Sequence, residues 1–272
     1  MQVAIIGLGL IGASFAKAIK ANTDHTVIGF DLDNDVLVSA LNDKAIDIIG
    51  KDEDISSADL TIVSLYPAAA ISFIKNNADK FKKGSVVIDT CGIKRDICNE
   101  IVPVAEQNGF TFIGAHPMAG KEVNGYYNSC SDLFCGASMI LVPCDKDVKM
   151  LTELCKKIGF GNITVTTAIE HDRIIAYTSQ LPHVLACAYI SDPDAKLHKG
   201  FSAGSYKDVS RVATINAELW NELFIQNKDC LSGHIQLLIE NLTKLNEFIT
   251  TENREQLTQM LADGDNIKRT VG

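Results

Sequence analysis

Three of the six histidines stand in contexts that suit proton transfer. His116 follows an apolar run and precedes a proline in GAHPMAGKE, His171 opens HDRIIAY, and His183 follows Pro182 in TSQLPH. An imidazole titrates near pH 6.5, so it can accept a proton from an alcohol at neutral pH. We therefore treat these three as candidate site residues. For His171 a structural alternative, pairing with the adjacent Asp172, stays open.

A second chemical signal is the string GLGLIG, which follows an apolar run at residues 3–6. Gly7 permits a tight turn, Gly9 lets the backbone approach a pyrophosphate, and Gly12 allows a helix to pack closely on the strand. The unpaired N–H groups at the start of that helix would face phosphates. This pattern predicts a dinucleotide-binding turn.

Asp31 supports that prediction and indicates which dinucleotide binds. It ends the apolar segment HTVIGFD, nineteen residues after Gly12, where this kind of fold places the group that contacts the adenosine ribose. A carboxylate there accepts hydrogen bonds from both ribose hydroxyls and repels a 2′-phosphate, and no arginine follows in LDNDVLVSA. The cofactor is therefore expected to be NAD. The alternative is that Asp31 only caps the next helix.

The segments that must position these residues alternate between strand and helix in the first part of the chain. Strand-like segments occupy residues 25–31, 58–67, 84–92, 110–117 and 137–143, and helix-like segments occupy 68–81 and 94–109. Strands separated by helices predict a doubly wound, mostly parallel α/β sheet. Ligands bind such sheets at the carboxyl ends of the strands. The expected cofactor contacts are Gly7, Leu8, Gly9, Leu10, Ile11, Gly12, Asp31, Ser64, Pro67 and Cys91.

From about residue 168 the pattern becomes helical, and no strand is expected after ITVTT at 163–167. We predict a dinucleotide-binding domain over residues 1–167 and a helical domain over 168–272. The segment 230–264 reads as one long amphipathic helix with an apolar stripe. We favour a dimer surface over an intramolecular core for this stripe, whose members are Ile235, Leu238, Ile239, Leu242, Leu245 and Phe248.

Composition excludes several classes of protein. The net charge of −9 argues against nucleic acid or an anionic membrane as a partner. Apolar stretches are too short to span a bilayer, and nothing in the sequence directs the chain out of the cytoplasm. The eight cysteines form no CxxC pair, so we expect reduced thiols and neither a zinc site nor a disulfide framework.

The two later histidines do not share one face of a straight helix. His183 lies twelve residues after His171, a rotation of about 120°. A kink at Pro182 would direct both toward one cleft. Gln180 is three residues before His183 and lies beside it.

Together these motifs resemble those of the prephenate and arogenate dehydrogenases of tyrosine biosynthesis. The matching segments are GLGLIG, Asp89 to Lys94, GAHPMAG, LFCGASMILVP, HDRIIAYTSQLPHVLA and SRVA followed by LW, in that order between residue 3 and about residue 228. The resemblance implies a Rossmann domain followed by a helical dimerisation domain, and hence a homodimer.

The resemblance also implies a reaction, the NAD-dependent oxidative decarboxylation of prephenate to 4-hydroxyphenylpyruvate, without a metal. His116 matches the catalytic histidine that accepts the proton of the C4 hydroxyl as hydride leaves. Arg211 matches the arginine that grips a substrate carboxylate, a contact that suits a guanidinium fork. Trp220 matches a tryptophan that closes the pocket, in this subunit or from its partner.

Four more residues receive roles on the substrate side from the resemblance. His183 matches a substrate-binding position, with Gln180 beside it, and His171 would act in the same cleft as a catalytic residue. Lys94 would add positive charge near the nicotinamide or the substrate, although an ordinary surface lysine is the alternative.

The chain departs from the family pattern at two positions. Relatives commonly have a serine where this chain has Gly92, so water, Thr90 or Cys91 would have to replace its hydroxyl. Many relatives have a histidine where this chain has Gln180, which bears on the choice between prephenate and arogenate. We favour prephenate.

Two other functions are weighed against this one. A 3-hydroxyacid or imine oxidoreductase would place a catalytic lysine early in the second domain, and HDRIIAYTSQLPH contains none. A regulatory protein that only senses NAD would need neither His116 nor Arg211.

Overall fold

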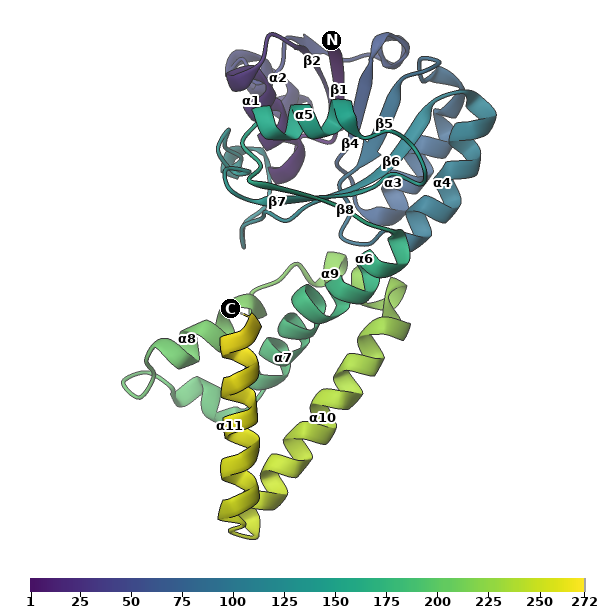
Figure 1. Cartoon of the computed structure of the whole chain (residues 1–272). Coiled ribbons are helices and arrows are strands. Elements are labelled where there is room, and N and C mark those ends of the chain that lie inside the picture. The colour runs from purple at the N-terminus through teal and green to yellow at the C-terminus, as the bar shows by residue number, and fades with distance from the viewer. Residues whose placement is uncertain (272) are drawn as a thin grey trace. The chain divides into compact units, whose positions relative to one another are not determined.

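The computed structural model describes residues 1–271, which form two compact units, Met1–Asn227 and a helical unit that begins at Lys228 (Figure 1). The first unit carries the whole sheet and all the candidate site residues.

The sheet has eight strands in the order β3-β2-β1-β4-β5-β6-β7-β8. All neighbouring strands pair in parallel except β6 and β7, which are antiparallel. This confirms the predicted doubly wound, mostly parallel sheet. The strands are β1 (Gln2–Ile6), β2 (Thr26–Phe30), β3 (Ile48–Ile49), β4 (Leu60–Val63), β5 (Val86–Asp89), β6 (Thr111–Pro117), β7 (Ser138–Val142) and β8 (Asn162–Val165).

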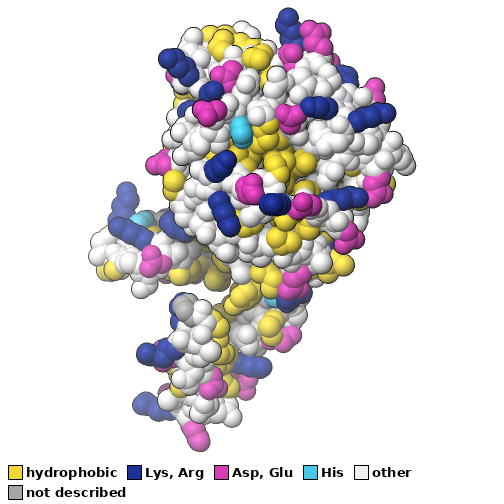
Figure 2. Space-filling model, turned by 45° about the horizontal axis from the view of Figure 1, so that its top comes forward, with side chains coloured by type: hydrophobic (Ala, Val, Ile, Leu, Met, Phe, Trp, Pro, Cys, Tyr) yellow, Lys and Arg dark blue, Asp and Glu magenta, His cyan; other side chains and the backbone are white. Residues whose placement is uncertain are grey.

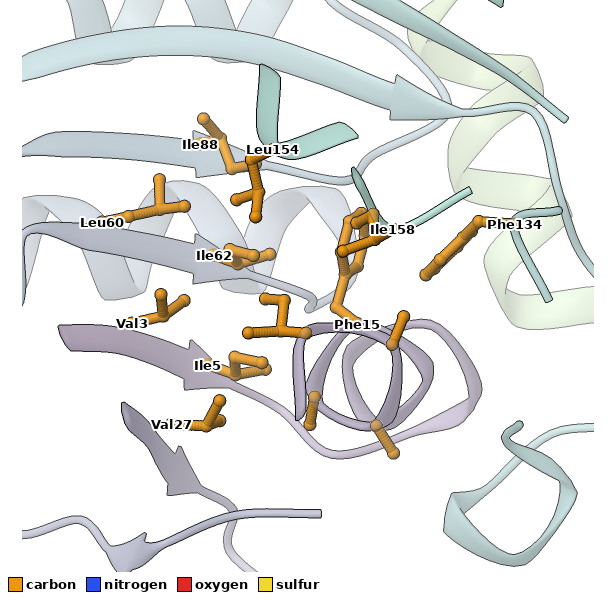
Figure 3. Close-up of a cluster of buried hydrophobic side chains, with 14 of the residues drawn as sticks. Val3, Ile5, Phe15, Val27, Leu60, Ile62, Ile88, Phe134, Leu154 and Ile158 are labelled. Carbon is orange, nitrogen blue, oxygen red and sulfur yellow. The ribbon is translucent and has the colours of Figure 1, made fainter. Parts of the chain in front are cut away.

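Helices cover both faces of this sheet because side chains alternate between the faces along each strand. Val3 and Ile5 of β1 point into one apolar cluster with Phe15 of α1 (Figure 3). Ile6 belongs to a second cluster on the other face. The first cluster also contains residues of α5, and the second contains residues of α3 and α4. These helices are α1 (Leu10–Asn22), α2 (Asn34–Asn42), α3 (Pro67–Asn76), α4 (Arg95–Asn108) and α5 (Lys149–Lys157).

Local sequence signals set the ends of these helices. Asp33 caps α2 by accepting from the N–H groups of Asp35 and Val36, and Pro67 begins α3, where its missing N–H is not needed. Gly109 ends α4 in the left-handed conformation, with φ at 80°. The strands β1, β2, β4, β5 and β6 run parallel, so their carboxyl ends lie at the same edge of the sheet.

After β8 the described chain is helical, as predicted. In the first unit the helices are α6 (Ala168–Ile175), a π-helical turn at Ala176–Gln180, α7 (Leu181–Ile190), α8 (Gly204–Ser210) and α9 (Ala217–Gln226). The boundary at residue 167 between a dinucleotide-binding domain and a helical domain stays a prediction.

The second unit consists of α10 (Lys228–Thr250) and α11 (Arg254–Val271). The expectation of one helix over 230–264 is therefore wrong. The chain turns at Thr251–Asn253, with Glu252 in the left-handed region at φ 50°, and the Asn253 side chain accepts from the N–H of Gln256. Of the predicted stripe on α10, Ile239 and Leu242 are each 50% exposed, whereas its other four members are partly buried.

The surface carries mixed charge. Acidic and basic side chains are interspersed on the face that Figure 2 shows. In the described part of the chain no helix combines the length and the apolar character that crossing a bilayer requires. All eight cysteines are free thiols.

Candidate active site

The glycine turn joins β1 to α1 and is held by close packing. A Cβ on Gly7 would lie 2.6 Å from the carbonyl oxygen of Ser64, and a Cβ on Gly12 would lie 1.9 Å from that of Gly7. Gly7 also has φ at 88°, which disfavours any side chain. In contrast, a Cβ on Gly9 would meet nothing within 4 Å, so the open space required for a phosphate lies there.

A cavity of about 450 Å³ opens beside this turn. We call it the glycine cavity. Six of the ten predicted cofactor contacts line it, namely Gly9, Leu10, Ile11, Ser64, Pro67 and Cys91. Leu8 does not, because its side chain is buried in the core and its N–H donates to Asp31. Gly7 and Gly12 act through packing, as described above.

Asp31 is fixed at the carboxyl end of β2 by two backbone donors. Its Oδ2 accepts from the N–H of Leu8 at 2.7 Å, and its Oδ1 accepts from the N–H of Asp33 at 3.0 Å. The helix-capping alternative does not hold, because the cap of α2 is Asp33. The Asp31 carboxylate is therefore tied to the glycine turn itself.

A second cavity, of about 410 Å³, adjoins the first. We call it the arginine cavity. His116, Lys121 and Trp220 line both cavities, whereas Arg211 and His183 line only the arginine cavity. His116 thus lies at the junction, where a group held in one cavity would meet a group held in the other.

His116 belongs to a chain of hydrogen bonds that leads away from the cavities. Its Nδ1 lies 2.9 Å from Nε2 of His171, and Nδ1 of His171 lies 2.7 Å from Oδ1 of Asp172. His171 and Asp172 are buried, and His116 is partly buried. We call this chain the relay. From sequence, Asp172 was expected only as a pairing partner that would make His171 structural.

Asp172 is held in its ionised form at the end of the relay. Its oxygens accept from the backbone N–H groups of Lys94 and Arg95 at 2.8 and 2.9 Å, and from Nε of Arg95 at 3.2 Å. Burial alone would raise the pKa of Asp172, but the hydrogen bonds from His171 and from these backbone groups outweigh it and lower the pKa.

An ionised Asp172 dictates the position of every proton in the relay. A carboxylate only accepts, so Nδ1 of His171 must carry its proton and Nε2 of neutral His171 must accept. Nδ1 of His116 is then the donor, which leaves a lone pair on Nε2 of His116. Burial lowers the pKa of His116 well below its usual value, and the electrostatic effect of Lys94 acts in the same direction. His116 is therefore a neutral base at pH 7.

The arginine cavity gathers charge and aromatic surface around this base. Nη1 of Arg211 lies 2.7 Å from Oε1 of Glu122. The ring of His183 stacks on Trp220 with a centroid distance of 3.7 Å, and its Nδ1 donates to the carbonyl of Ser179. Burial lowers the pKa of His183, so it offers a neutral Nε2 to a ligand.

The helix that carries His171 and His183 changes register before Pro182. The N–H of Leu181 donates to the carbonyl of Ala176, a π-helical bond five residues back. A π-turn over 176–180 therefore stands where a kink at Pro182 was expected. His183 lines the arginine cavity and His171 lines neither cavity, so the expectation that both face one cleft is wrong. Proline has no N–H to donate to the carbonyl four residues earlier. The turn before Pro182 instead forms a hydrogen bond that spans five residues.

Two residues expected to bind substrate are buried instead. The Lys94 side chain has no exposed surface and pairs with Asp89, and it lines neither cavity. Gln180 is 1% exposed; it donates to the carbonyl of Leu223 at 3.1 Å and accepts from Asn227 at 2.8 Å. The prediction that Lys94 and Gln180 bind substrate is therefore wrong, because their polar groups bind other groups of the protein. The surface-lysine alternative for Lys94 is wrong for the same reason.

Lys121 and Glu122 also line the arginine cavity; neither was predicted, although both stand directly after GAHPMAG. Lys121 supplies a second cation beside Arg211. Nζ of Lys121 donates to the carbonyl of Asn128 at 3.0 Å and to the Cys130 sulfur at 3.3 Å, and neither partner lines the cavity.

Neither neighbour of Gly92 that was considered as a replacement for a serine hydroxyl is hydrogen-bonded to His116. The Thr90 hydroxyl donates to Ser64 at 3.4 Å, and the Cys91 thiol is directed at the carbonyl of Leu65. A Cβ at Gly92 would lie 3.3 Å from the Leu223 side chain, so space is tight. In this chain the polar partner of His116 is His171.

Two family models match the chain. The nucleotide-binding domain of prephenate dehydrogenase matches residues 15–161, and the prephenate dehydrogenase dimerization domain matches residues 167–263. A cyclohexadienyl dehydrogenase of Zymomonas mobilis is 30% identical over 274 residues, which cover 95% of this chain and 92% of the relative.

Solved structures agree in fold along the whole chain. The arogenate dehydrogenase of Synechocystis superposes with a TM-score of 0.85 at 23% identity, covering all of both chains. The prephenate dehydrogenase of A. aeolicus in complex with hydroxyphenyl propionate and NAD⁺ gives 0.84 at 23% identity, covering 100% of this chain and 98% of that one.

Proposed function

Because the chain belongs to the prephenate dehydrogenase family, we propose that it catalyses the NAD-dependent oxidative decarboxylation of prephenate to 4-hydroxyphenylpyruvate. The observation that carries the proposal is the place and state of His116. It lies where the two cavities meet, and the relay leaves a lone pair on its Nε2.

The glycine cavity is proposed to hold NAD. The open space at Gly9 fits a pyrophosphate, and the Asp31 carboxylate next to the turn fits unmodified ribose hydroxyls and disfavours a 2′-phosphate. When bound, NAD supplies the hydride acceptor at its nicotinamide ring. The residues that hold it are those lining the glycine cavity.

His116 takes and returns one proton in this proposal. Its Nε2 accepts the proton of the C4 hydroxyl as the hydride leaves C4 and the C4–O bond becomes a carbonyl. Cleavage of the C1–carboxylate bond releases carbon dioxide, and the electron pair of that bond enters the ring. The oxygen at C4 then regains the proton from His116 as the ring becomes aromatic. The buried Asp172 stabilises the imidazolium through His171.

Charge in the arginine cavity favours prephenate over arogenate. Prephenate carries two carboxylates, and the cavity offers Arg211 and Lys121 as cations. Arogenate carries an ammonium group in place of the side-chain keto group, and the one carboxylate among the lining residues, Glu122, already pairs with Arg211. Arogenate dehydrogenation to tyrosine is the second candidate function.

We also propose a homodimer in the cytoplasm. The match to a dimerization domain and the exposure of Ile239 and Leu242 in the apolar stripe of α10 support pairing of two chains. The eight free thiols fit a reducing compartment.

One assay tests both candidate functions. NADH formation is measured separately with prephenate and with arogenate, for the wild type and for His116→Asn. We expect turnover with prephenate and a loss of about 10²-fold or more in kcat for the variant, with NAD binding retained. A kcat/KM greater with arogenate than with prephenate would identify arogenate as the preferred substrate. Full activity of the His116→Asn variant would refute the role of His116.

A further inference from the structure

Lys94 and Asp89 form a fully buried ion pair that the proposed chemistry does not use. Both side chains have no exposed surface. Burial disfavours the lysine ammonium, but Asp89 outweighs that effect and raises the pKa of Lys94. A charged pair is therefore kept inside the protein, where an apolar pair of similar size would often be at least as stable. Its position suggests a use.

We infer that this ion pair is a positioning device for His116, joining the strand that carries His116 to the helix that holds Asp172. The inference rests on the proposed function, because it gives His116 a base to position. Its elements are Asp89 at the end of β5, Lys94 just before α4, and the backbone of β6 at Ala115.

The first contact lies where β6 leaves β5. The parallel ladder between these strands ends at Ile88 and Ile113, and β6 goes on as the antiparallel partner of β7, with His116 opposite Ile140. Beyond the ladder, Oδ1 of Asp89 accepts from the N–H of Ala115 at 3.0 Å. The Asp89 carboxylate thus replaces the backbone hydrogen bond that the β5–β6 ladder no longer supplies, at the residue before His116.

The second contact ties the same carboxylate to the relay. Oδ2 of Asp89 accepts from Nζ of Lys94 and, at 2.9 Å, from the N–H of Cys91. The backbone N–H of Lys94 in turn donates to Asp172 at 2.8 Å. Lys94 therefore binds two carboxylates: its side chain binds Asp89, and its backbone N–H binds Asp172 at the end of the relay.

Gly114 makes room for this arrangement. A Cβ at that position would lie 2.9 Å from Cδ of Lys94 and 3.1 Å from the Cys98 sulfur. The lysine stem therefore crosses β6 at the one residue without a side chain, two positions before His116. The space needed by the Lys94 side chain is therefore a physical reason for the first glycine of GAHPMAG, and nucleotide binding does not supply that reason.

The ammonium of Lys94 also acts on the base electrostatically. Its charge opposes protonation of both His116 and His171, in addition to the larger effect of burial. Asp172 and Asp89 act in the opposite direction on His171. The groups facing Lys94 itself are Asp89, Cys91 and Cys98. Lys121, Glu122 and Arg211 line the cavity on the open side of His116.

The test measures the pKa of His116 directly, by NMR titration of histidine-labelled protein, with the signal assigned from His116→Asn. We expect Lys94→Met to raise the pKa of His116 by about one unit, the lower end of the effect of a neighbouring charge. The acidic limb of the kcat/KM profile should move to higher pH by the same amount, because the base must be unprotonated to act.

Two further variants keep the test decisive. Asp89→Asn combined with Lys94→Met leaves no unpaired buried charge and should also raise the pKa of His116. Lys82→Met removes a surface ion pair with Asp59 and should change neither measurement. An unchanged His116 titration in the folded Lys94 variants would overturn the inference. Because the titration needs no turnover, failure of the proposed reaction would be recognised separately by inactive wild-type enzyme.

Discussion

The relay makes a demanding prediction for Asp172→Asn, a change of one oxygen to an NH₂ group. Asp172 accepts hydrogen bonds from Lys94, Arg95 and His171, and it donates in none of these contacts. If the new NH₂ group faces His171, Nδ1 of that ring must become an acceptor. Its Nε2 then carries the proton and donates to His116, so the proton of His116 moves to Nε2 and the base is lost.

The size of the effect follows from the two bonds that must reverse. Reversal of a single histidine in a comparable aspartate–histidine pair lowers kcat by about 10⁴. Here the perturbation crosses two rings, at 2.7 and 2.9 Å, and each ring can relax. We therefore expect kcat to fall by about 10² to 10⁴, which is about 3 to 5 kcal/mol of activation free energy.

Steady-state kinetics with prephenate and saturating NAD measures this loss. The matched control is Asp47→Asn, since Asp47 also accepts from a backbone N–H, that of Val27 at 2.8 Å, and pairs with Lys20 at 2.7 Å, but lies outside both cavities. We expect the control to keep its kcat. A folded Asp172→Asn enzyme with kcat within threefold of wild type would refute the tautomer assignment.

Three other predictions follow. Arg211→Ala should raise KM for prephenate by about tenfold to a hundredfold, a range that allows for the exposure of the guanidinium; an unchanged KM would remove Arg211 from the substrate site. Asp31→Ser should weaken NAD and improve NADP, with Asp33→Ser as a control that keeps the cap of α2; unaltered preference would mean that the ribose is read elsewhere. The three histidines of the site have lowered pKa values, so below about pH 6.5 the unfolded chain binds more protons and the free energy of unfolding falls, by up to about 1.4 kcal/mol per pH unit for each. Urea denaturation between pH 5 and 8 measures this, and a flat curve would contradict it.

Regular elements were predictable because their causes are local. The apolar runs became strands of one sheet, and the glycine turn lies at the start of α1, since periodicity and glycine placement act over a few residues. The turn at 251–253 was missed because apolar spacing continues on both sides of it. The π-turn before Pro182 was missed because a missing N–H shows where a bond is lost, but not how the helix adjusts.

The sequence by itself determined which chemical groups the site can use: an imidazole at His116, a carboxylate at Asp31 and a guanidinium at Arg211. Only the tertiary structure decided which polar residues face the cavities and which face one another. Lys94 and Gln180 carry groups suited to substrate but are used inside the protein, whereas Lys121 enters both cavities. Residue type sets what a group can do, but burial and partners depend on contacts between segments far apart in the chain, such as Lys94 with Asp172.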